Sequence, residues 1–110
     1  MKERQDVLQR FVMEMRGMFG ESLKKIILYG SYARGDNRND SDIDIMILTA
    51  LSDNEIRKIE DKAYDIAFGF EVSDKVHINV NIRNEDHFNY WLGALPYYDN
   101  IEREGILLDG

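Results

Sequence analysis

The sequence predicts an α+β fold in which helices pack against one small mixed β-sheet. Stretches with an apolar residue at every third or fourth position, typical of amphipathic helices, alternate along the chain with short runs rich in β-branched residues. The chain is 110 residues long and 44% hydrophobic, which suits a single core. We therefore expect one domain over residues 1–110, with the order helix, strand, strand, helix, strand, helix.

The first predicted helix covers residues 3–19. Gly17 or Gly20 would end it, since glycine disfavours helix. Its apolar residues form one stripe: Val7, Leu8, Phe11, Val12, Met15, Met18 and Phe19. The first strand follows at residues 25–29, a short apolar run that is closed by Gly30 and is typical of a buried strand.

The next strand and helix have clear signals. Residues 42–48 alternate between polar and apolar side chains and then become continuously apolar, so this strand is polar on one face only at its start. Ser52 and Glu55 have the spacing of a capping box, in which two side chains satisfy backbone amides at a helix start. A second amphipathic helix is therefore predicted from there to Phe70.

The last third of the chain predicts one strand and two short helices. Residues 76–82 alternate at period two, with one apolar and one polar face. Asn84 can cap a third helix, which Pro96 interrupts. Residues 97–104 form the last predicted helix.

Charge and composition exclude several classes of protein. The chain has 21 acidic and 14 basic residues and a net charge of −7, which disfavours binding to the phosphate backbone of a polynucleotide. It contains no cysteine, which excludes disulfides, thiolate zinc sites and cysteine nucleophiles. No apolar run approaches the ~18 residues of a membrane span, and the first residues do not form a signal peptide. We expect a soluble, cytoplasmic protein without a membrane partner.

The residues that suggest chemistry are Gly30-Ser31 and, after ten more residues, Asp42-Ile43-Asp44. Alternate residues of a strand point to the same face, so Asp42 and Asp44 project together. Two neighbouring carboxylates repel each other unless a cation or a proton lies between them. Mg²⁺ suits this arrangement because it binds one or two carboxylates together with substrate phosphates.

Gly30 and Ser31 follow a buried strand, where backbone amides and the serine hydroxyl can bind an anion. Each feature also has an ordinary interpretation, because a Gly-Ser pair is common in turns and Asp-x-Asp is common on a solvated strand face. Together, an anion-binding turn and metal-binding carboxylates on adjacent elements predict metal-assisted phosphoryl transfer.

Residues 30–44 resemble the signature of the nucleotidyltransferase superfamily related to polymerase β. Their sequence, Gly-Ser-Tyr-Ala-Arg-Gly-Asp-Asn-Arg-Asn-Asp-Ser-Asp-Ile-Asp, is similar to that of its minimal nucleotidyltransferase (MNT) branch, and in particular to the MntA-type antitoxins of HEPN/MNT pairs. Residues 95–108 resemble the C-terminal end of that branch. The likeness spans about residue 25 to the end and implies a minimal polymerase β-like nucleotidyltransferase fold.

The resemblance implies roles for individual residues. Gly30 and Ser31 would hold the triphosphate of a nucleoside triphosphate such as ATP. Asp42 and Asp44 would be the catalytic residues and would bind Mg²⁺, which bridges the phosphates and promotes attack on the α-phosphorus, with pyrophosphate leaving.

Arg34 and Ser41 also match positions that the branch usually fills with the same residues, and both are predicted to belong to the nucleotide-binding site. Ser41 would steady the carboxylates by hydrogen bonding. Arg34 would contact phosphate or, alternatively, form an ordinary surface ion pair. Four tyrosines would either stack on a base or serve in packing: Tyr29, Tyr32, Tyr97 and Tyr98.

One departure from the superfamily concerns a third carboxylate, which the next strand usually supplies as metal ligand and general base. Here the polar face of residues 76–82 carries no acid, and Asn79 is the best match. An amide cannot accept a proton. His77 could act as the base near neutral pH or be a structural histidine. Glu71 and Asp74 precede the strand and could reach the site.

Three functions are compatible with these features. The first is a nucleotidyltransferase that moves a nucleoside monophosphate, AMP from ATP, onto a hydroxyl. The MNT resemblance implies a HEPN-type toxin as the partner that carries the acceptor hydroxyl. The length of the chain supports this, because 110 residues leave no room for a second domain to bind a small-molecule or RNA acceptor. The second is a nucleotide-binding module, weakened by the missing acid, that neutralises a partner by binding alone. The third is a small-molecule nucleotidyltransferase completed by homodimerisation, so that a homo-oligomer is also a possible state of the chain.

Overall fold

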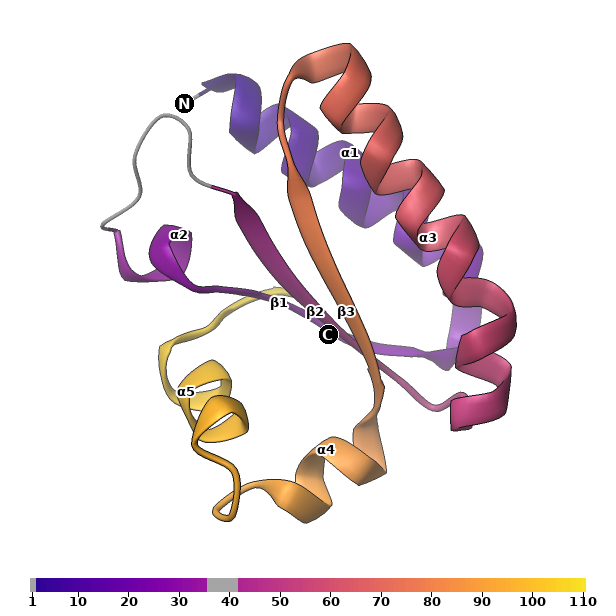
Figure 1. Cartoon of the computed structure of the whole chain (residues 1–110), viewed down its shortest axis with the longest axis vertical. Helices are drawn as coiled ribbons and strands as arrows, with labels where there is room; N and C mark the ends of the chain where they lie inside the picture. The colour runs from indigo at the N-terminus through magenta and orange to yellow at the C-terminus, as the bar shows by residue number, and fades with distance from the viewer. Residues whose placement is uncertain (1, 36–41) are drawn as a thin grey trace.

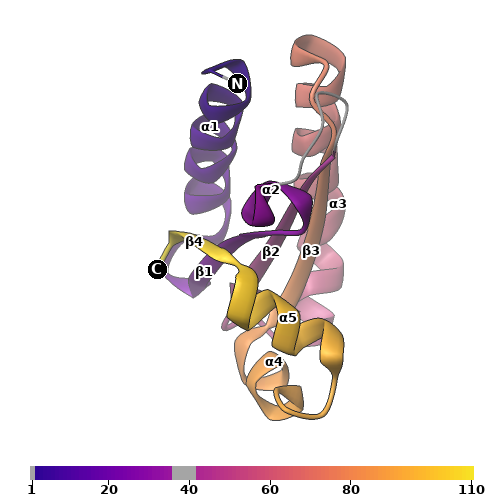
Figure 2. The same cartoon turned by 90° about the vertical axis from the view of Figure 1, so that its left-hand side faces the viewer.

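The computed structural model describes residues 2–35 and 42–110. Four strands form one sheet in the order β3-β2-β1-β4, and helices lie on both of its faces (Figures 1 and 2). The elements in chain order are α1 (Lys2–Phe19), a 3₁₀ turn η1 (Gly20–Ser22), β1 (Leu23–Tyr29), α2 (Ser31–Arg34), β2 (Ile43–Thr49), α3 (Asp53–Asp74), β3 (Ile78–Asn84), α4 (Glu85–Trp91), α5 (Pro96–Glu104) and β4 (Ile106–Asp109).

The sheet is mixed, as predicted. β2 pairs antiparallel with β1 and parallel with β3, while β4 pairs antiparallel with β1. The parallel pair requires a crossover between its strands, and α3 makes that connection. The predicted fold class is therefore confirmed, and the structure adds a fourth strand and the single turn α2.

Two hydrophobic cores lie on opposite faces of the sheet. α1 and α3 cover one face, and α4 and α5 cover the other (Figure 2). Apolar residues that alternate along β2 therefore enter different cores, with Ile45 in the first and Met46 in the second. The second core also contains Phe88 of α4 and Ile101 of α5.

The apolar stripe predicted for the first helix packs against the sheet. Val7, Phe11 and Met15 are completely buried. Gly17 does not end the helix, because α1 continues to Phe19 and ends before Gly20, whose backbone is left-handed (φ +58°).

The capping box at the start of α3 is confirmed. The hydroxyl of Ser52 accepts a hydrogen bond from the backbone of Glu55, and the carboxylate of Glu55 accepts one from the backbone of Ser52. The helix extends four residues beyond Phe70, to Asp74. The sequence predicts that the third strand starts at residue 76, but it starts at Ile78. Its pairing with β2 also begins at Ile78, which lies opposite Ile43.

The C-terminal part contains the largest addition to the predicted fold. Asn84 caps α4 by accepting a hydrogen bond from the backbone of His87, as expected. Pro96 does not interrupt this helix, which already ends at Trp91, but is the first residue of α5. Residues 106–109 then form β4, which an apolar run of three residues, Ile106 to Leu108, could not reveal. No helix within the described residues combines the length and hydrophobicity needed to cross a lipid bilayer.

Candidate active site

Three strand ends meet at one end of the sheet. β2 and β3 begin there, and β1, which runs in the opposite direction to β2, ends there at Tyr29, before Gly30. In the register of the sheet Asp44 lies between Tyr29 on β1 and Asn79 on β3. α4 follows β3 at the opposite end of the sheet (Figure 1), whereas α5 contacts the site end of β1 through Tyr97, whose hydroxyl is hydrogen-bonded to that of Tyr29.

Asp42 and Asp44 are brought together, as the alternation of β2 predicts. Oδ2 of Asp42 and Oδ1 of Asp44 both accept hydrogen bonds from Nδ2 of Asn79, at 3.3 and 3.1 Å. The intervening Ile43 and the following Ile45 are fully buried in the core on the opposite face. The burial of these two isoleucines thus turns both carboxylates toward Asn79.

Asn79 also ends a chain of hydrogen-bonded side chains, the Glu71–His77–Asn79 chain. Its Oδ1 lies 2.8 Å from Nε2 of His77, and Nδ1 of His77 lies 3.0 Å from Oε1 of Glu71. With acceptors on both sides, both ring nitrogens donate, which is the arrangement of a protonated imidazole. Burial lowers the pKa of His77, but the hydrogen bonds to Glu71 and Asn79 and the charge of Asp42 outweigh it and raise the pKa above its ordinary value.

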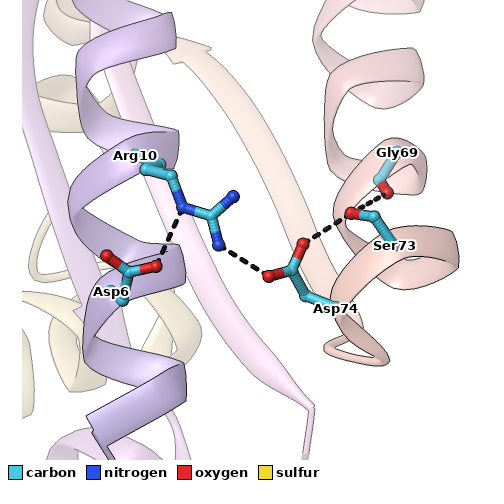
Figure 3. Close-up of polar contacts among 5 residues, drawn as sticks. All are labelled: Asp6, Arg10, Gly69, Ser73 and Asp74. Carbon is cyan, nitrogen blue, oxygen red and sulfur yellow. Dashed lines mark hydrogen bonds and ion pairs between the residues drawn. The ribbon is translucent and has the colours of Figure 1, made fainter.

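Neither acid that precedes β3 contacts the aspartate pair directly. Glu71 is joined to the pair only through His77 and Asn79. Asp74 belongs to a different contact: it accepts a hydrogen bond of 2.6 Å from Arg10 of α1, which also binds Asp6 at 3.0 Å (Figure 3). Asp74 therefore links α3 to α1.

The aspartate pair suits a divalent cation whose remaining ligands come from outside the protein. Its two oxygens converge on one polar atom, Nδ2 of Asn79, and a cation can take the place of that shared donor. In the described ranges no group of three His, Cys, Asp or Glu residues could hold a metal ion by itself. Mg²⁺ commonly completes its coordination with phosphate oxygens and water, so the pair fits Mg²⁺ bound to a nucleotide.

Gly30 lies directly against the carboxylate of Asp44. Its backbone is left-handed (φ +75°), and a Cβ atom at this position would overlap the carboxylate oxygen Oδ2 of Asp44. Glycine is required here for both reasons. The turn that follows β1 therefore lies next to β2, the strand that carries Asp44.

Arg34 lies at the end of the one-turn helix α2. Its backbone N–H donates to the carbonyl of Gly30 at 3.1 Å, and its guanidinium is 3.8 Å from the carboxylate of Glu104 on α5. The surface ion pair that the sequence allowed is therefore present, beside the glycine turn. Ser31 starts α2, and Ser41 lies outside the described residues.

Two of the four tyrosines named from the sequence, Tyr29 and Tyr97, form a cluster next to the glycine turn together with Asn81, which the sequence did not connect to them. The hydroxyls of Tyr29 and Tyr97 are 2.7 Å apart, and Asn81 donates to Tyr29 at 2.7 Å. Burial, followed by the hydrogen bond to Tyr97, raises the pKa of Tyr29 well above its usual range. Both tyrosines line a cavity of about 210 Å³ together with Gly30 and Arg34.

The other two tyrosines serve in packing. Tyr32 packs against the core beneath α1 and α3, and Tyr98 is buried against Phe88 in the second core. One sequence signal for the cluster exists: Asn81 shares the polar face of its strand with Asn79. Tyr29 and Tyr97 are 68 residues apart, and only the fold brings them together.

Solved structures with the same fold include a toxin–antitoxin complex that was crystallised with AMP-PNP. It superposes with a TM-score of 0.57, covering 92% of this chain and 72% of its own, at 21% identity. A mutant of the toxin–antitoxin MntA-HpeT gives a TM-score of 0.55 over 90% of this chain and 70% of its own, at 20% identity. These likenesses show the fold.

Sequence relatives carry the comparison further. A protein of Methanocaldococcus jannaschii named "Putative protein adenylyltransferase" is 32% identical over 101 residues, which cover 92% of this chain and 93% of the relative. A second protein of that organism with the same description is 37% identical over 43 residues, or 39% of this chain and 43% of its own. The nucleotidyltransferase domain family matches residues 8–108. This chain therefore belongs to the nucleotidyltransferase domain family.

Proposed function

We propose that this protein is a Mg²⁺-dependent nucleotidyltransferase that moves AMP from ATP to a hydroxyl group on a partner protein. The observation that carries the proposal is the contact between Gly30 and Asp44, which joins an anion-binding turn to the carboxylate pair. Membership of the nucleotidyltransferase domain family supports the reaction class. The relatives named as protein adenylyltransferases support AMP as the transferred group and a protein as the acceptor.

The site residues then have separate tasks. The backbone at Gly30 and Ser31 binds the triphosphate, and Arg34 and Ser41 belong to the same nucleotide-binding site. Asp42 and Asp44 hold Mg²⁺, which when bound neutralises phosphate charge at the reacting phosphorus.

The proton of the attacking hydroxyl needs a separate acceptor. Asn79 cannot take it, because an amide has no basic group. His77 is the titratable group bonded to Asn79, and its other nitrogen faces the carboxylate of Glu71. His77 is therefore the candidate base, provided that its ring loses the proton it carries in this arrangement and that the hydroxyl takes the place of Asn79 at Nε2, with Glu71 stabilising the positive charge that the ring regains.

The partner proposed is a HEPN-type toxin, with this chain as its antitoxin. The similar folds of chains from toxin–antitoxin complexes support a protein partner, and the AMP-PNP in one of them supports an adenine nucleotide as ligand. The MntA-HpeT mutant carries two Asp-to-Glu changes at positions two residues apart, the same spacing as Asp42 and Asp44.

The test is transfer from ATP labelled at the α-phosphate to the candidate toxin in the presence of Mg²⁺. Asp42→Asn and Asp44→Asn should each lower the transfer rate by about 100-fold or more, because each removes a charge that faces the cation. Asp61→Asn, at an exposed position of α3, is the matched control and should leave the rate unchanged.

The alternative function is a nucleotide-binding module that neutralises its partner by contact. The amide of Asn79 at the third-strand position favours it. A complex with the candidate toxin that forms equally well with Asp42→Asn, without any labelling by the unmodified protein, would establish this alternative and reject the enzyme.

A further inference from the structure

The outer side of α3 carries a row of exposed apolar side chains, which we call the α3 stripe. Tyr64, Phe68 and Val72 are spaced four residues apart and therefore follow one side of the helix. The exposed fractions of these residues are 42, 61 and 58%. A continuous row of this kind is typical of an interaction surface.

The α3 stripe borders an open edge of the sheet. β3 is the outermost strand on its side, and α3 runs beside it (Figure 1). A cavity of about 420 Å³ lies between the two elements, and both Tyr64 and Phe68 line it. An edge strand offers backbone N–H and C=O groups along its outer side, so an extended segment can add to β3 while one of its side chains enters the cavity.

The same cavity reaches the candidate active site. Its lining includes Glu71, His77 and Asn79, which form the hydrogen-bonded chain described above. Asn79 in turn donates to both Asp42 and Asp44. Only Asn79 therefore lies between a side chain held in the cavity and the carboxylates of Asp42 and Asp44.

Charge distinguishes between the possible occupants of this surface. The acids between residues 64 and 74 are Asp65, Glu71 and Asp74, and the cations Lys62 and Lys75 flank this stretch. Arg10 pairs with Asp74 and His77 pairs with Glu71, whereas Asp65 lines the cavity without a Lys or Arg among the other lining residues. A second copy would bring the same carboxylates and a net charge of −7, so like charges would oppose self-association. A cationic partner is favoured.

We infer that the α3 stripe and the outer edge of β3 dock an extended segment of the partner protein, apolar at its centre and flanked by Lys or Arg, that brings the acceptor hydroxyl to Asn79. The delivery of a hydroxyl rests on the proposed function. The docking itself requires neither nucleotide nor metal, so it is tested without either.

The probe is a synthetic peptide, Lys-Lys-Val-Tyr-Val-Lys-Lys, titrated into ¹⁵N-labelled protein and followed by NMR. We expect amide shifts confined to residues 64–72 and 77–81, with a Kd of about 1 mM or tighter. The charge-reversed peptide Glu-Glu-Val-Tyr-Val-Glu-Glu should cause none of these shifts.

Three variants localise the docking. Phe68→Ser and Asp65→Lys should each weaken binding of the cationic peptide by about tenfold, and Asp65→Lys should acquire binding of the acidic one. Met13→Ser is the matched control, because Met13 is 68% exposed on α1 and does not line the cavity. It should bind like the unmodified protein.

Several results would overturn the docking surface. These are shifts centred on Met13, equal affinity for the two peptides, and no binding at about 5 mM peptide. Concentration-dependent line broadening of the α3 stripe without peptide, removed by Phe68→Ser, would identify a second copy as the occupant instead.

A transfer assay on the partner protein separates this inference from the proposed function. Phe68→Ser should raise the KM for the partner and leave kcat unchanged, since Phe68 lies outside the catalytic residues. Transfer that is unaffected by Phe68→Ser rejects the docking surface alone. Peptide binding as predicted, with no transfer to the partner, rejects the proposed function alone.

Discussion

Asn79 is the residue that relieves the charge repulsion between Asp42 and Asp44. Its Nδ2 donates to both carboxylates, so the pair is stabilised without a cation. A carboxylate in its place would bring a third negative charge and remove the donor, and would make a cation necessary. We therefore expect the side chain at this one position to set how strongly the aspartate pair needs a cation.

We predict that Asn79→Asp makes the protein more dependent on Mg²⁺. Without metal its melting temperature should fall by about 4 °C or more, the effect of ~1 kcal/mol in a domain of this size. Millimolar Mg²⁺ should restore it, while the unmodified protein should respond less. If the missing acid limits catalysis, the variant should also transfer AMP faster.

Asn81→Asp is the control for that substitution. Asn81 lies two residues further along β3 on the same face and contacts Tyr29 instead of the aspartates. An equal response of the two variants to Mg²⁺ would show that the effect comes from added charge in general and not from the proposed metal-binding pair, Asp42 and Asp44.

α3 packs into the core with one side and forms the proposed docking surface with the other. Ala63 and Ala67 pack into the core, whereas Tyr64 and Phe68 face solvent and the cavity beside β3. Its last turns also supply Glu71 to the chain that ends at the active site. The start of this helix is set by its capping box, which therefore also fixes the position of the proposed docking surface several turns away.

Ser52→Ala should destabilise the protein by about 1 kcal/mol, because the backbone N–H of Glu55 loses its acceptor. Urea unfolding followed by circular dichroism measures this as a lower midpoint at an unchanged slope. Asp61→Asn, at an exposed position inside the same helix, is the control and should leave the midpoint nearly unchanged. Equal losses would contradict a specific capping contribution.

On the scale of the whole molecule, two of the ion pairs among the described residues connect α1 to parts of the chain that are distant in sequence. Arg10 of α1 binds Asp74 at the end of α3, and Arg16 of α1 binds Asp109 at the end of β4. α1 is thereby linked both to the helix that carries the proposed docking surface and to the C-terminal strand.

These pairs predict a loss of stability in acid. The hydrogen bond from Arg16 is the main reason that the pKa of Asp109 is lowered from its ordinary value of 3.8. A lowered pKa stabilises the folded state above the unfolded-state value, and this contribution is lost as the pH falls through the folded-state value. Asp109→Asn should therefore be less stable than the unmodified protein at pH 7, and the difference should shrink below pH 3.8.

Chemical denaturation at a series of pH values measures that difference. Asp61→Asn, at an exposed position of α3, is the control and should follow the unmodified protein throughout. A difference for Asp109→Asn that stays constant from pH 7 to acid would mean that packing, and not the ion pair, is responsible.

Much of the fold follows from local patterns. The stripe of Val7, Phe11 and Met15 predicts α1, and the Ser52–Glu55 spacing predicts the start of α3, because both depend on residues within a few turns of one helix. β4 is different. Four residues carry too little periodicity, and their strand exists through its pairing with β1.

The candidate site divides in the same way. By itself, the sequence determined that Asp42 and Asp44 share one face and that a glycine turn precedes them, since side-chain direction along a strand is a local property. The tertiary structure alone decided that Asn79 bridges the two carboxylates, that Glu71 joins them through His77, and that the α3 stripe lies beside this chain. These contacts depend on strand order and register, which place residues far apart in sequence within hydrogen-bonding distance.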